Sequence, residues 1–349
     1  MSKSTVNFAI IGTGSIADFH AAGIKDAKDT RLHSVFNRSF DKAKAFAEKH
    51  QTRACSSLEE LLSAPELDAV CITSPSGTHA EAAVAALNAG KHILCEKPLD
   101  ISLERVDAIL DAANSSGKIL AAVFQSRLAP NAMRLKKAID AGRFGKITFA
   151  SCHVKWWRDQ PYYDASPVRG TWASDGGGCL MNQGIHAIDT LQWLVGKPVE
   201  VSAMIDTIAH ENIEVEDVAA ATLRFANGAL GVVEGATAAW PGFQKRIEIA
   251  GDKGSAVLED DSLTTWNFQD EQPEDKAILA EGDDKIMGSG SSDPRAISTE
   301  GHRLLIDDLA EAIRTNGQPA ISGPDARNAV EIILAIYQSA RERRFVTLG

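Results

Sequence analysis

Gly12-Thr13-Gly14-Ser15-Ile16-Ala17 follows directly on Val6–Ile11, an apolar run in which β-branched residues are frequent. Such a run predicts a buried strand, and the residues after the turn predict a helix. In a G-x-G-x-x-A turn the glycines allow a tight bend and a close backbone approach to a pyrophosphate, while a small last residue lets the helix pack on the strand. The helix N-terminus then faces the phosphates. We therefore expect a dinucleotide-binding unit with Gly12, Thr13, Gly14, Ser15 and Ile16 at the cofactor.

The alternation of strand and helix patterns continues as far as Phe124. Further strands are expected at about residues 32–36, 67–73, 92–94 and 119–124, and helices at 41–50, 58–62, 79–89 and 103–115. Repeated βα units predict a parallel, doubly wound sheet. We therefore assign residues 1–124 to a Rossmann dinucleotide-binding domain.

Strands predominate after Gln125. The expected strands are 146–157, 199–210, 217–225, 231–238, 245–250 and 255–258, with a hairpin turn at Asn227-Gly228. The expected helices are 132–141, 186–195, 302–314 and 325–341, and the polar stretch 270–294 reads as an exposed loop. Long antiparallel neighbours predict an α+β domain on an open, mainly antiparallel sheet. The fold class is thus α/β plus α+β, with residues 125–349 forming the second domain.

The composition excludes several classes of protein. The chain has 349 residues and a formal net charge of −11, which argues against non-specific nucleic-acid binding. Its apolar runs are too short to span a bilayer, and a short polar lead runs straight into the first strand, so we expect neither membrane association nor a signal peptide. The five scattered cysteines form no Cys-x-x-Cys pair and no metal-spaced cluster. We expect reduced thiols, no metal and a cytoplasmic location.

The second predicted strand ends in Asn37-Arg38-Ser39, where NAD-specific sites place an acidic residue for the ribose 2′-hydroxyl. Asn37 can still bond a hydroxyl, and Arg38 can pair with a 2′-phosphate. We therefore expect NADP or dual specificity, the alternative being that Arg38 merely faces solvent. Ser74 and Pro75 follow another strand and are expected at the cofactor. His79 could touch the nicotinamide side, or be a capping or internally satisfied histidine.

Cys95-Glu96-Lys97-Pro98 follows residues 92–94, which predict a buried parallel strand. Open α/β sheets bind their ligands at the carboxyl ends of such strands. Pro98 fixes the backbone after the lysine, and an X-Pro bond also allows the cis form. We therefore expect Glu96 and Lys97 at the cofactor, against the alternative of one more exposed lysine.

A second unusual stretch, residues 175–189, begins Asp-Gly-Gly-Gly and contains Asn182 and His186. Three consecutive glycines permit a backbone path that side chains would forbid. Asn182 and His186 are four residues apart and would share one face of a helix. A polar pair of this kind suits proton transfer at a substrate hydroxyl, and a capping or core histidine is the alternative.

These motifs together, in this order, resemble the Gfo/Idh/MocA family of glucose–fructose oxidoreductases and inositol dehydrogenases, over essentially the whole chain. The resemblance implies oligomerisation through the C-terminal sheet and identifies Lys97 and His186 as the catalytic pair. Lys97 would bond the reacting hydroxyl and the nicotinamide ribose, and His186 would take or return the proton. Inositol dehydrogenase-like members carry Asp where this chain has Asn182, which resembles the family's nucleotide-sugar 3-dehydrogenases instead.

Further residues are candidates for the substrate pocket. Gln125 and Arg127 resemble the family's substrate-facing pair. Aromatic residues with arginines suit the apolar face and hydroxyl edge of a sugar, or a phosphate, although core and interface aromatics are the alternative. With Asn182 and His186, the remaining candidates are Trp156, Trp157, Arg158, Tyr162, Tyr163, Arg169 and Trp172.

The sequence therefore predicts an NAD(P)-dependent oxidoreductase that interconverts a secondary alcohol of a sugar, glycoside or nucleotide sugar with its ketone. A glycoside hydrolase acting through a transient 3-keto sugar is one alternative, and a non-catalytic dinucleotide and sugar sensor is another. The expected partners are a small carbohydrate and further copies of the chain, as a homodimer or homotetramer.

Overall fold

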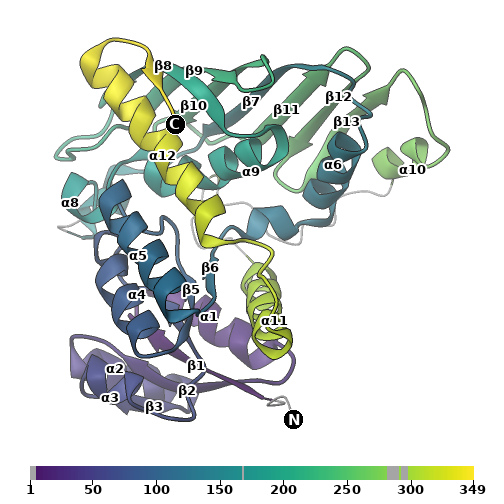
Figure 1. Ribbon diagram of the computed structural model, residues 1–349. Helices are drawn as coiled ribbons and strands as arrows, with labels where there is room; N and C mark the ends of the chain where they lie inside the picture. The colour runs from purple at the N-terminus through teal and green to yellow at the C-terminus, as the bar shows by residue number, and fades with distance from the viewer. Residues whose placement is uncertain (1–4, 167–168, 281–290, 292–297) are drawn as a thin grey trace. The chain divides into compact units, whose positions relative to one another are not determined.

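The computed structural model describes residues 5–166, 169–280, 291 and 298–349. The chain divides into two compact units (Figure 1). The first combines the residues up to Gln125 with Thr299–Arg327, and the second combines Ser126–Ser298 with Asn328–Gly349.

The first unit is built on a parallel sheet, to which the described residues contribute six strands in the order β3-β2-β1-β4-β5-β6. This is the strand order of the Rossmann fold. It confirms the predicted doubly wound sheet. The strands are β1 Val6–Ile11, β2 Thr30–Phe36, β3 Arg53–Cys55, β4 Ala69–Ile72, β5 His92–Cys95 and β6 Leu120–Ala122.

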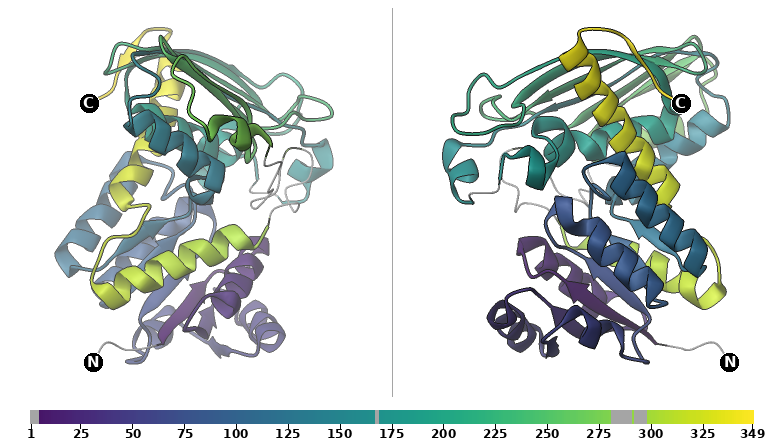
Figure 2. Two further views of the ribbon diagram at one scale, coloured as in Figure 1. Left: turned by 90° about the vertical axis from the view of Figure 1, so that its right-hand side faces the viewer. Right: turned by 60° about the vertical axis from the view of Figure 1, so that its left-hand side comes forward.

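Helices cover both faces of this sheet, with α4 and α5 on one face and α1 and α11 on the other (Figures 1 and 2). The side chains of Ser57 and Ser102 accept hydrogen bonds from backbone N–H groups at the starts of α3 and α5. The helices are α1 Ser15–Asp26, α2 Phe40–His50, α3 Leu58–Leu62, the 3₁₀ turn η1 Ser76–Thr78, α4 His79–Asn88, α5 Leu103–Ser116 and α11 Glu300–Thr315.

Helix α11 was expected in the second domain, but its contacts group it with the first unit. Its apolar stripe buries Leu305, Ile306 and Leu309. A Cβ atom at Gly23 of α1 would lie 2.9 Å from the Ile306 side chain and 3.0 Å from the Arg303 backbone nitrogen. Glycine therefore allows α1 and α11 to cross closely. Helical periodicity predicts an apolar stripe but not which surface covers it.

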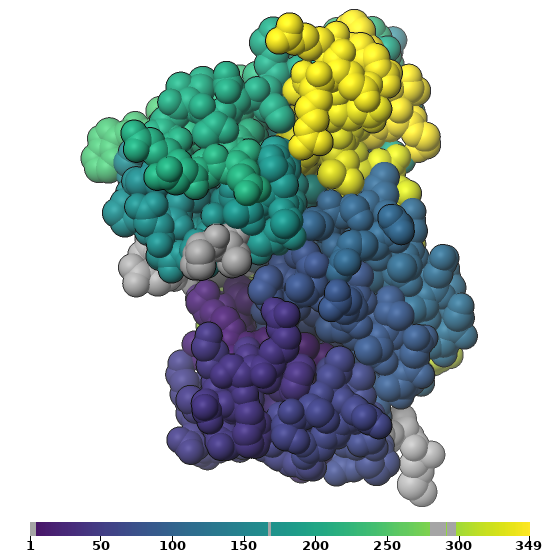
Figure 3. All heavy atoms as spheres, turned by 90° about the vertical axis from the view of Figure 1, so that its left-hand side faces the viewer, coloured from purple at the N-terminus to yellow at the C-terminus, as the bar shows by residue number. Residues whose placement is uncertain are grey.

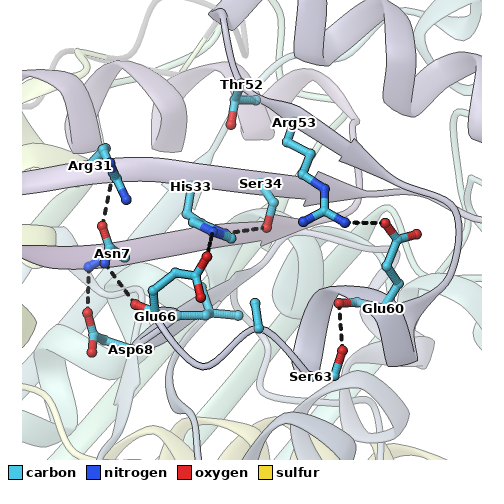
Figure 4. A network of polar contacts seen from close by, with 12 residues as sticks. Asn7, Arg31, His33, Ser34, Thr52, Arg53, Glu60, Ser63, Glu66 and Asp68 are labelled. Carbon is cyan, nitrogen blue, oxygen red and sulfur yellow. Dashed lines mark hydrogen bonds and ion pairs between the residues drawn. The ribbon is translucent and has the colours of Figure 1, made fainter.

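A polar network closes the amino ends of β1, β2 and β4, opposite the ends at which parallel sheets bind ligands (Figure 4). Asn7 accepts a hydrogen bond from Arg31 at 3.0 Å and donates from its side chain to the Glu66 carbonyl oxygen at 2.8 Å. Its backbone N–H donates to Asp68 at 2.8 Å. Buried Asn7 thus has its polar groups satisfied.

The second unit is built on a sheet whose described strands follow the order β13-β12-β11-β7-β10-β9-β8-β14. Strands β7 and β10 pair in parallel, and the other described pairs are antiparallel, which confirms a mainly antiparallel sheet. The expected turn at Asn227-Gly228 joins β9 to β10. The strands are β7 Ile147–Lys155, β8 Pro198–Asp206, β9 Val218–Phe225, β10 Leu230–Ala236, β11 Arg246–Gly251, β12 Gly254–Glu259, β13 Ser262–Phe268 and β14 Val346–Thr347.

Helices α6, α9 and α12 lie on one face of this sheet, and its other face carries no described helix (Figures 1 and 2). The helical elements are the 3₁₀ turn η2 Gln125–Leu128, α6 Pro130–Asp140, α7 Gln160–Asp164, α8 Trp172–Asp175, the π-helical segment η3 Cys179–Gly184, α9 Ile185–Val195, α10 Asp275–Ala280 and α12 Gly323–Glu342. None of the described helices has the length and hydropathy needed to cross a bilayer.

Two local predictions for the second unit were wrong. Strand β13 was not predicted, although Leu263, Trp266 and Phe268 are buried between polar neighbours. Helix α10 lies inside the stretch expected to be a loop, where Asp275 accepts hydrogen bonds from Arg143 and from the Trp266 indole. The rest of that stretch, residues 281–290 and 292–294, lies outside the described residues.

Candidate active site

The glycine turn after β1 is held against the end of β4. Gly12 has a φ of +102°, and a Cβ there would lie 2.7 Å from Ser74 N and from the Thr73 carbonyl. The Thr73 hydroxyl bonds the carbonyl oxygens of Ile11 and Gly12 at 3.1 and 2.9 Å. Glycine is therefore required here by both conformation and space. At Gly14, the N-cap of α1, a Cβ would meet no described atom within 4 Å, so the helix N-terminus stays accessible to a phosphate.

The two candidate residues after β2, Asn37 and Arg38, differ in their hydrogen bonding. The Asn37 amide donates to the Thr13 hydroxyl at 2.8 Å and its oxygen accepts from Ser39 N at 2.8 Å. Asn37 therefore ties the end of β2 to the glycine turn. Arg38 is exposed and makes no hydrogen bond or ion pair to a described residue, so its guanidinium is available to a ligand.

His79 matches the second of its two readings, an internally satisfied histidine. It is 1% exposed, and its ring nitrogens lie 2.8 Å from the Pro98 carbonyl oxygen and 2.7 Å from that of Ser74. It thus joins the Ser74-Pro75 loop to the bend after Lys97. The histidine helps to shape the carboxyl end of the sheet rather than offering a free nitrogen.

Lys97 lies immediately beyond β5, at the carboxyl end of the parallel sheet, and is half-buried. The Lys97–Pro98 peptide bond is cis. The Lys97 backbone N–H donates to Glu96 Oε2 at 3.2 Å. The other oxygen of Glu96 accepts from His20 Nε2 at 2.9 Å and His302 Nε2 at 3.4 Å, two residues that sequence patterns did not single out.

Two of the three glycines of the second stretch are required by close contacts with the buried residues Tyr337 and Glu216. A Cβ at Gly177, which has a φ of +156°, would lie 2.0 Å from the Tyr337 hydroxyl oxygen. One at Gly178 would lie 1.9 Å from the Glu216 carbonyl oxygen. Side chains at either position would therefore drive the backbone away from Tyr337 and Glu216.

Glu216 anchors the segment that leads to His186. Its carboxylate accepts from Gly178 N at 2.8 Å, Leu180 N at 2.9 Å and the Tyr337 hydroxyl at 2.8 Å. Burial raises the pKa of Glu216 above its usual value, although these hydrogen bonds act in the opposite direction. No sequence pattern identified Glu216, because it acts on backbone groups that any sequence would supply.

Asn182 lies in π-helical η3 and His186 in the first turn of α9. Asn182 Oδ1 accepts from Gln183 Nε2 at 3.1 Å, and the His186 carbonyl accepts from the Thr190 hydroxyl at 2.8 Å. Both side chains are half-buried. Asn182 and His186 were expected to share one face of an α-helix. Asn182 instead lies in a π-helix, in which hydrogen bonds join residues i and i+5, so a spacing of four residues does not by itself put the two side chains on one face.

Beside η3, two aromatic rings and one guanidinium group help to form a small pocket whose lining includes Tyr162, Tyr163, Arg169, Asn182 and Gln183. The Arg169 guanidinium carbon lies 4.2 Å from the Tyr162 ring centroid, and Arg169 donates to the Tyr162 carbonyl oxygen. Gln183 bonds the Tyr162 hydroxyl at 3.1 Å. This pocket brings Arg169 and Asn182 together from separate elements.

Arg158 is buried and donates to Oε1 of Gln183, a lining residue of this pocket, at 2.9 Å, and its guanidinium carbon lies 5.2 Å from the Trp156 ring centroid. The Trp156 indole N–H is buried and has no hydrogen-bond partner among the described residues. In the first unit, the Gln125 side-chain oxygen likewise has none within the described ranges. Such groups suit hydrogen bonds to a ligand.

Three predicted substrate residues make contacts typical of structural side chains. Arg127 is 3% exposed and forms a bidentate pair with Asp189 at 2.7 and 2.6 Å. The Tyr163 hydroxyl donates to Thr237 at 2.9 Å. Trp172 packs on Tyr337 with ring centroids 5.1 Å apart, and Arg341 lies over its ring. For these three, contacts within the second unit account for the side chain.

Comparison with known proteins decides the family. Residues 6–124 match the profile of the oxidoreductase family with an NAD-binding Rossmann fold, and residues 132–257 match the GFO/IDH/MocA C-terminal domain. The chain belongs to the Gfo/Idh/MocA family.

Relatives in this family match the whole chain. The structure is similar to that of the WlbA dehydrogenase of Chromobacterium violaceum in complex with NADH and UDP-GlcNAcA, with a TM-score of 0.88, 32% identity and coverage of 100% of this chain and 97% of the other. The myo-inositol 2-dehydrogenase of Thermotoga maritima is 29% identical over 353 residues, covering 98% of both chains.

A third relative bears on the cofactor. The NADP⁺-dependent scyllo-inositol 2-dehydrogenase IolU of Bacillus subtilis is 32% identical over 200 residues, 57% of this chain and 61% of its own length. As a Gfo/Idh/MocA member with a Rossmann unit, the protein is an NAD(P)-dependent oxidoreductase.

Proposed function

We propose that this enzyme interconverts a secondary alcohol of a sugar or nucleotide sugar with its ketone, using Lys97 and His186. The observation that carries the proposal is the position of Lys97 at the carboxyl end of β5. The glycine turn after β1 lies at the same edge of this parallel sheet. Gly12, Gly14 and the N-terminus of α1 would hold the dinucleotide, which supplies hydride transfer when bound.

The two residues have different chemical tasks. The Lys97 ammonium donates a hydrogen bond to the reacting oxygen and stabilises negative charge that develops there. His186 accepts the hydroxyl proton during oxidation and returns it during reduction. Asn182 cannot take up a proton, so it orients the sugar.

The residues beside η3 favour a sugar substrate that also carries an anionic group. The Arg169 guanidinium lies over the Tyr162 ring and pairs with no carboxylate of the described residues, so it is available to an anion. A nucleotide sugar or sugar acid has both features. This choice is consistent with Asn182 in place of the Asp of inositol dehydrogenase-like members.

The deciding experiment measures reduced cofactor while the enzyme is incubated with oxidised cofactor and a panel of inositols, glycosides, sugar acids and nucleotide sugars. Accumulation of NADH or NADPH with an anionic sugar supports the proposal. Release of the leaving group without accumulation identifies the glycoside hydrolase alternative. Saturable binding of cofactor and sugar with neither product identifies the sensor.

We further propose that the enzyme accepts NADP, alone or together with NAD, because Arg38 is exposed and the residue before it is Asn37 rather than an acid. Arg38→Ala should weaken NADP binding by about tenfold and leave NAD binding within about twofold, since the lost contact is to the 2′-phosphate. Titration of both cofactors into wild type and variant measures this. A strong wild-type preference for NAD with an unchanged ratio in the variant makes Arg38 a solvated surface residue.

We also propose a cytoplasmic homo-oligomer that assembles through the open face of the second sheet. The five cysteines are free and buried, as suits a reducing compartment. Phe149, Leu230 and Phe345 are exposed large apolar residues around one hollow of that face. Figure 3 shows the C-terminal part of the chain, coloured yellow, at the surface of this unit. Exposed apolar patches of this kind mark interaction surfaces.

Leu230→Lys should therefore shift the enzyme to a smaller species, because it places a charge within the apolar hollow. Sedimentation velocity of wild type and variant measures the change. Met133→Lys is the matched control, since Met133 is exposed on α6 and does not line the hollow. Equal sedimentation of wild type and Leu230→Lys would remove this face from the assembly.

A further inference from the structure

Three buried side chains from distant parts of the chain converge next to Lys97. His20 on α1 is 0% exposed, His302 on α11 is 1% exposed and Glu96 after β5 is 6% exposed. Both imidazole Nε2 atoms approach Glu96 Oε1, and the two rings meet edge to face with centroids 4.8 Å apart. We call these residues the His–Glu–His cluster.

The ligand atoms of this cluster lie within 4.8 Å of one another, close enough to hold a metal ion. The surroundings of the two Nδ1 atoms argue against a metal ion. Ligating histidines donate their other ring N–H to a partner, whereas the Nδ1 atoms of His20 and His302 are buried with no hydrogen-bond partner among the described residues. Neutral imidazoles that donate from Nε2 leave Nδ1 without a proton, so no buried donor is unsatisfied.

The charge state of the cluster follows from its burial and its hydrogen bonds. Burial raises the pKa of Glu96, but the hydrogen bonds from His20 and His302 outweigh it and hold the pKa well below its usual range. Burial lowers the pKa of His20, so its imidazole stays neutral. Burial, and then the negative charge of Glu96, raises the pKa values of the Cys71 and Cys95 thiols, so they remain neutral.

We propose that the His–Glu–His cluster is a positioning device for Lys97, in which the two histidines fix one oxygen of Glu96 and thereby aim the other at the Lys97 backbone N–H. Glu96 Oε2 accepts that N–H at 3.2 Å. The cluster also places a buried negative charge one residue from the lysine ammonium. This inference rests on the proposed catalytic role of Lys97.

Helix α11 thereby acquires a role in the active site as well as in the core. It comes from residues 300–315, and His302 lies 206 residues from Glu96 in the sequence. Gly23 allows α11 to lie against α1, which carries His20. Lys28 N donates to Asp307 at 2.7 Å and fixes the same crossing further along. Small shifts of α11 would therefore be transmitted to Glu96.

The test compares His302→Leu, which removes the donor, with His302→Gln, whose side-chain amide can replace Nε2–H. His302→Leu should lower kcat about tenfold at saturating cofactor. The KM for the sugar and the Kd for NADH should stay within about threefold of the wild-type values. His302→Gln should recover most of the loss. Glu96→Gln should lower kcat further, because the amide turns an N–H donor toward the Lys97 N–H. Leu309→Ala is the control, since it weakens the α11 packing without touching the cluster.

The outcomes separate this inference from the proposed function. If Lys97→Ala abolishes turnover but His302→Leu retains it, the cluster does not position Lys97. If Leu309→Ala lowers kcat as much as His302→Leu, or His302→Gln gives no recovery, the role of His302 is structural. If Lys97→Ala has normal turnover, the proposed function itself fails. If the purified chain contains one zinc ion that is lost in His302→Leu, the cluster is a metal site and the proposed hydrogen-bonded arrangement is wrong.

Discussion

Lys97→Ala should lower kcat by about a hundredfold or more, while the Kd for cofactor changes by less than about fivefold. The ammonium is proposed to donate to the reacting oxygen, where charge changes most between bound substrate and transition state. A donor aimed at that atom contributes far more to turnover than to binding. The contacts proposed for the dinucleotide, at the glycine turn and the N-terminus of α1, are unchanged in this variant.

The measurement is steady-state kinetics with one confirmed sugar, accompanied by fluorescence titration of NADH. Lys42→Ala is the matched control, because Lys42 is an exposed lysine on α2 of the same unit. Its kinetics should equal those of wild type. Turnover of Lys97→Ala within about threefold of wild type would exclude the lysine from the chemistry and leave His186 alone to account for it.

The sequence predicted the parts of the fold that local patterns determine. The strand, glycine turn and helix around Gly12 form as expected, because periodicity and turn chemistry act within a few residues. The position of α11 was not predictable in this way, since its apolar stripe fits either unit. Contacts between residues far apart in the sequence, such as the close crossing at Gly23, decide which surface the helix covers.

Candidate residues were identified by chemical type, and the structure sorts them by their contacts. Arg127 and Trp172 are the types that bind sugars and phosphates, yet Asp189 and Tyr337 engage them within the second unit. Glu216 was missed for the opposite reason. A lone glutamate before a strand belongs to no recognisable sequence pattern. Its importance comes from the hydrogen bonds that its carboxylate accepts from backbone N–H groups and from the Tyr337 hydroxyl.

His186→Ala should lower kcat/KM by about a hundredfold to ten-thousandfold and remove a limb from its pH profile. Among the residues proposed to act on the hydroxyl, a histidine is the side chain whose charge changes near neutral pH. In the oxidative direction the base must be neutral, so wild-type kcat/KM should rise with pH through that limb. Without the imidazole, the rate should become nearly independent of pH across the same range.

Asn182 separates proton transfer from positioning. Asn182→Ala should raise KM and slow the reaction while the limb remains, because an amide does not titrate. Asn182→Asp adds a negative charge four residues before His186, which favours imidazolium and should move the limb to higher pH. The measurement is kcat/KM against pH for wild type and the three variants with one substrate. A limb that survives in His186→Ala would assign the proton to another group, Lys97 first, and would leave His186 only to orient the sugar.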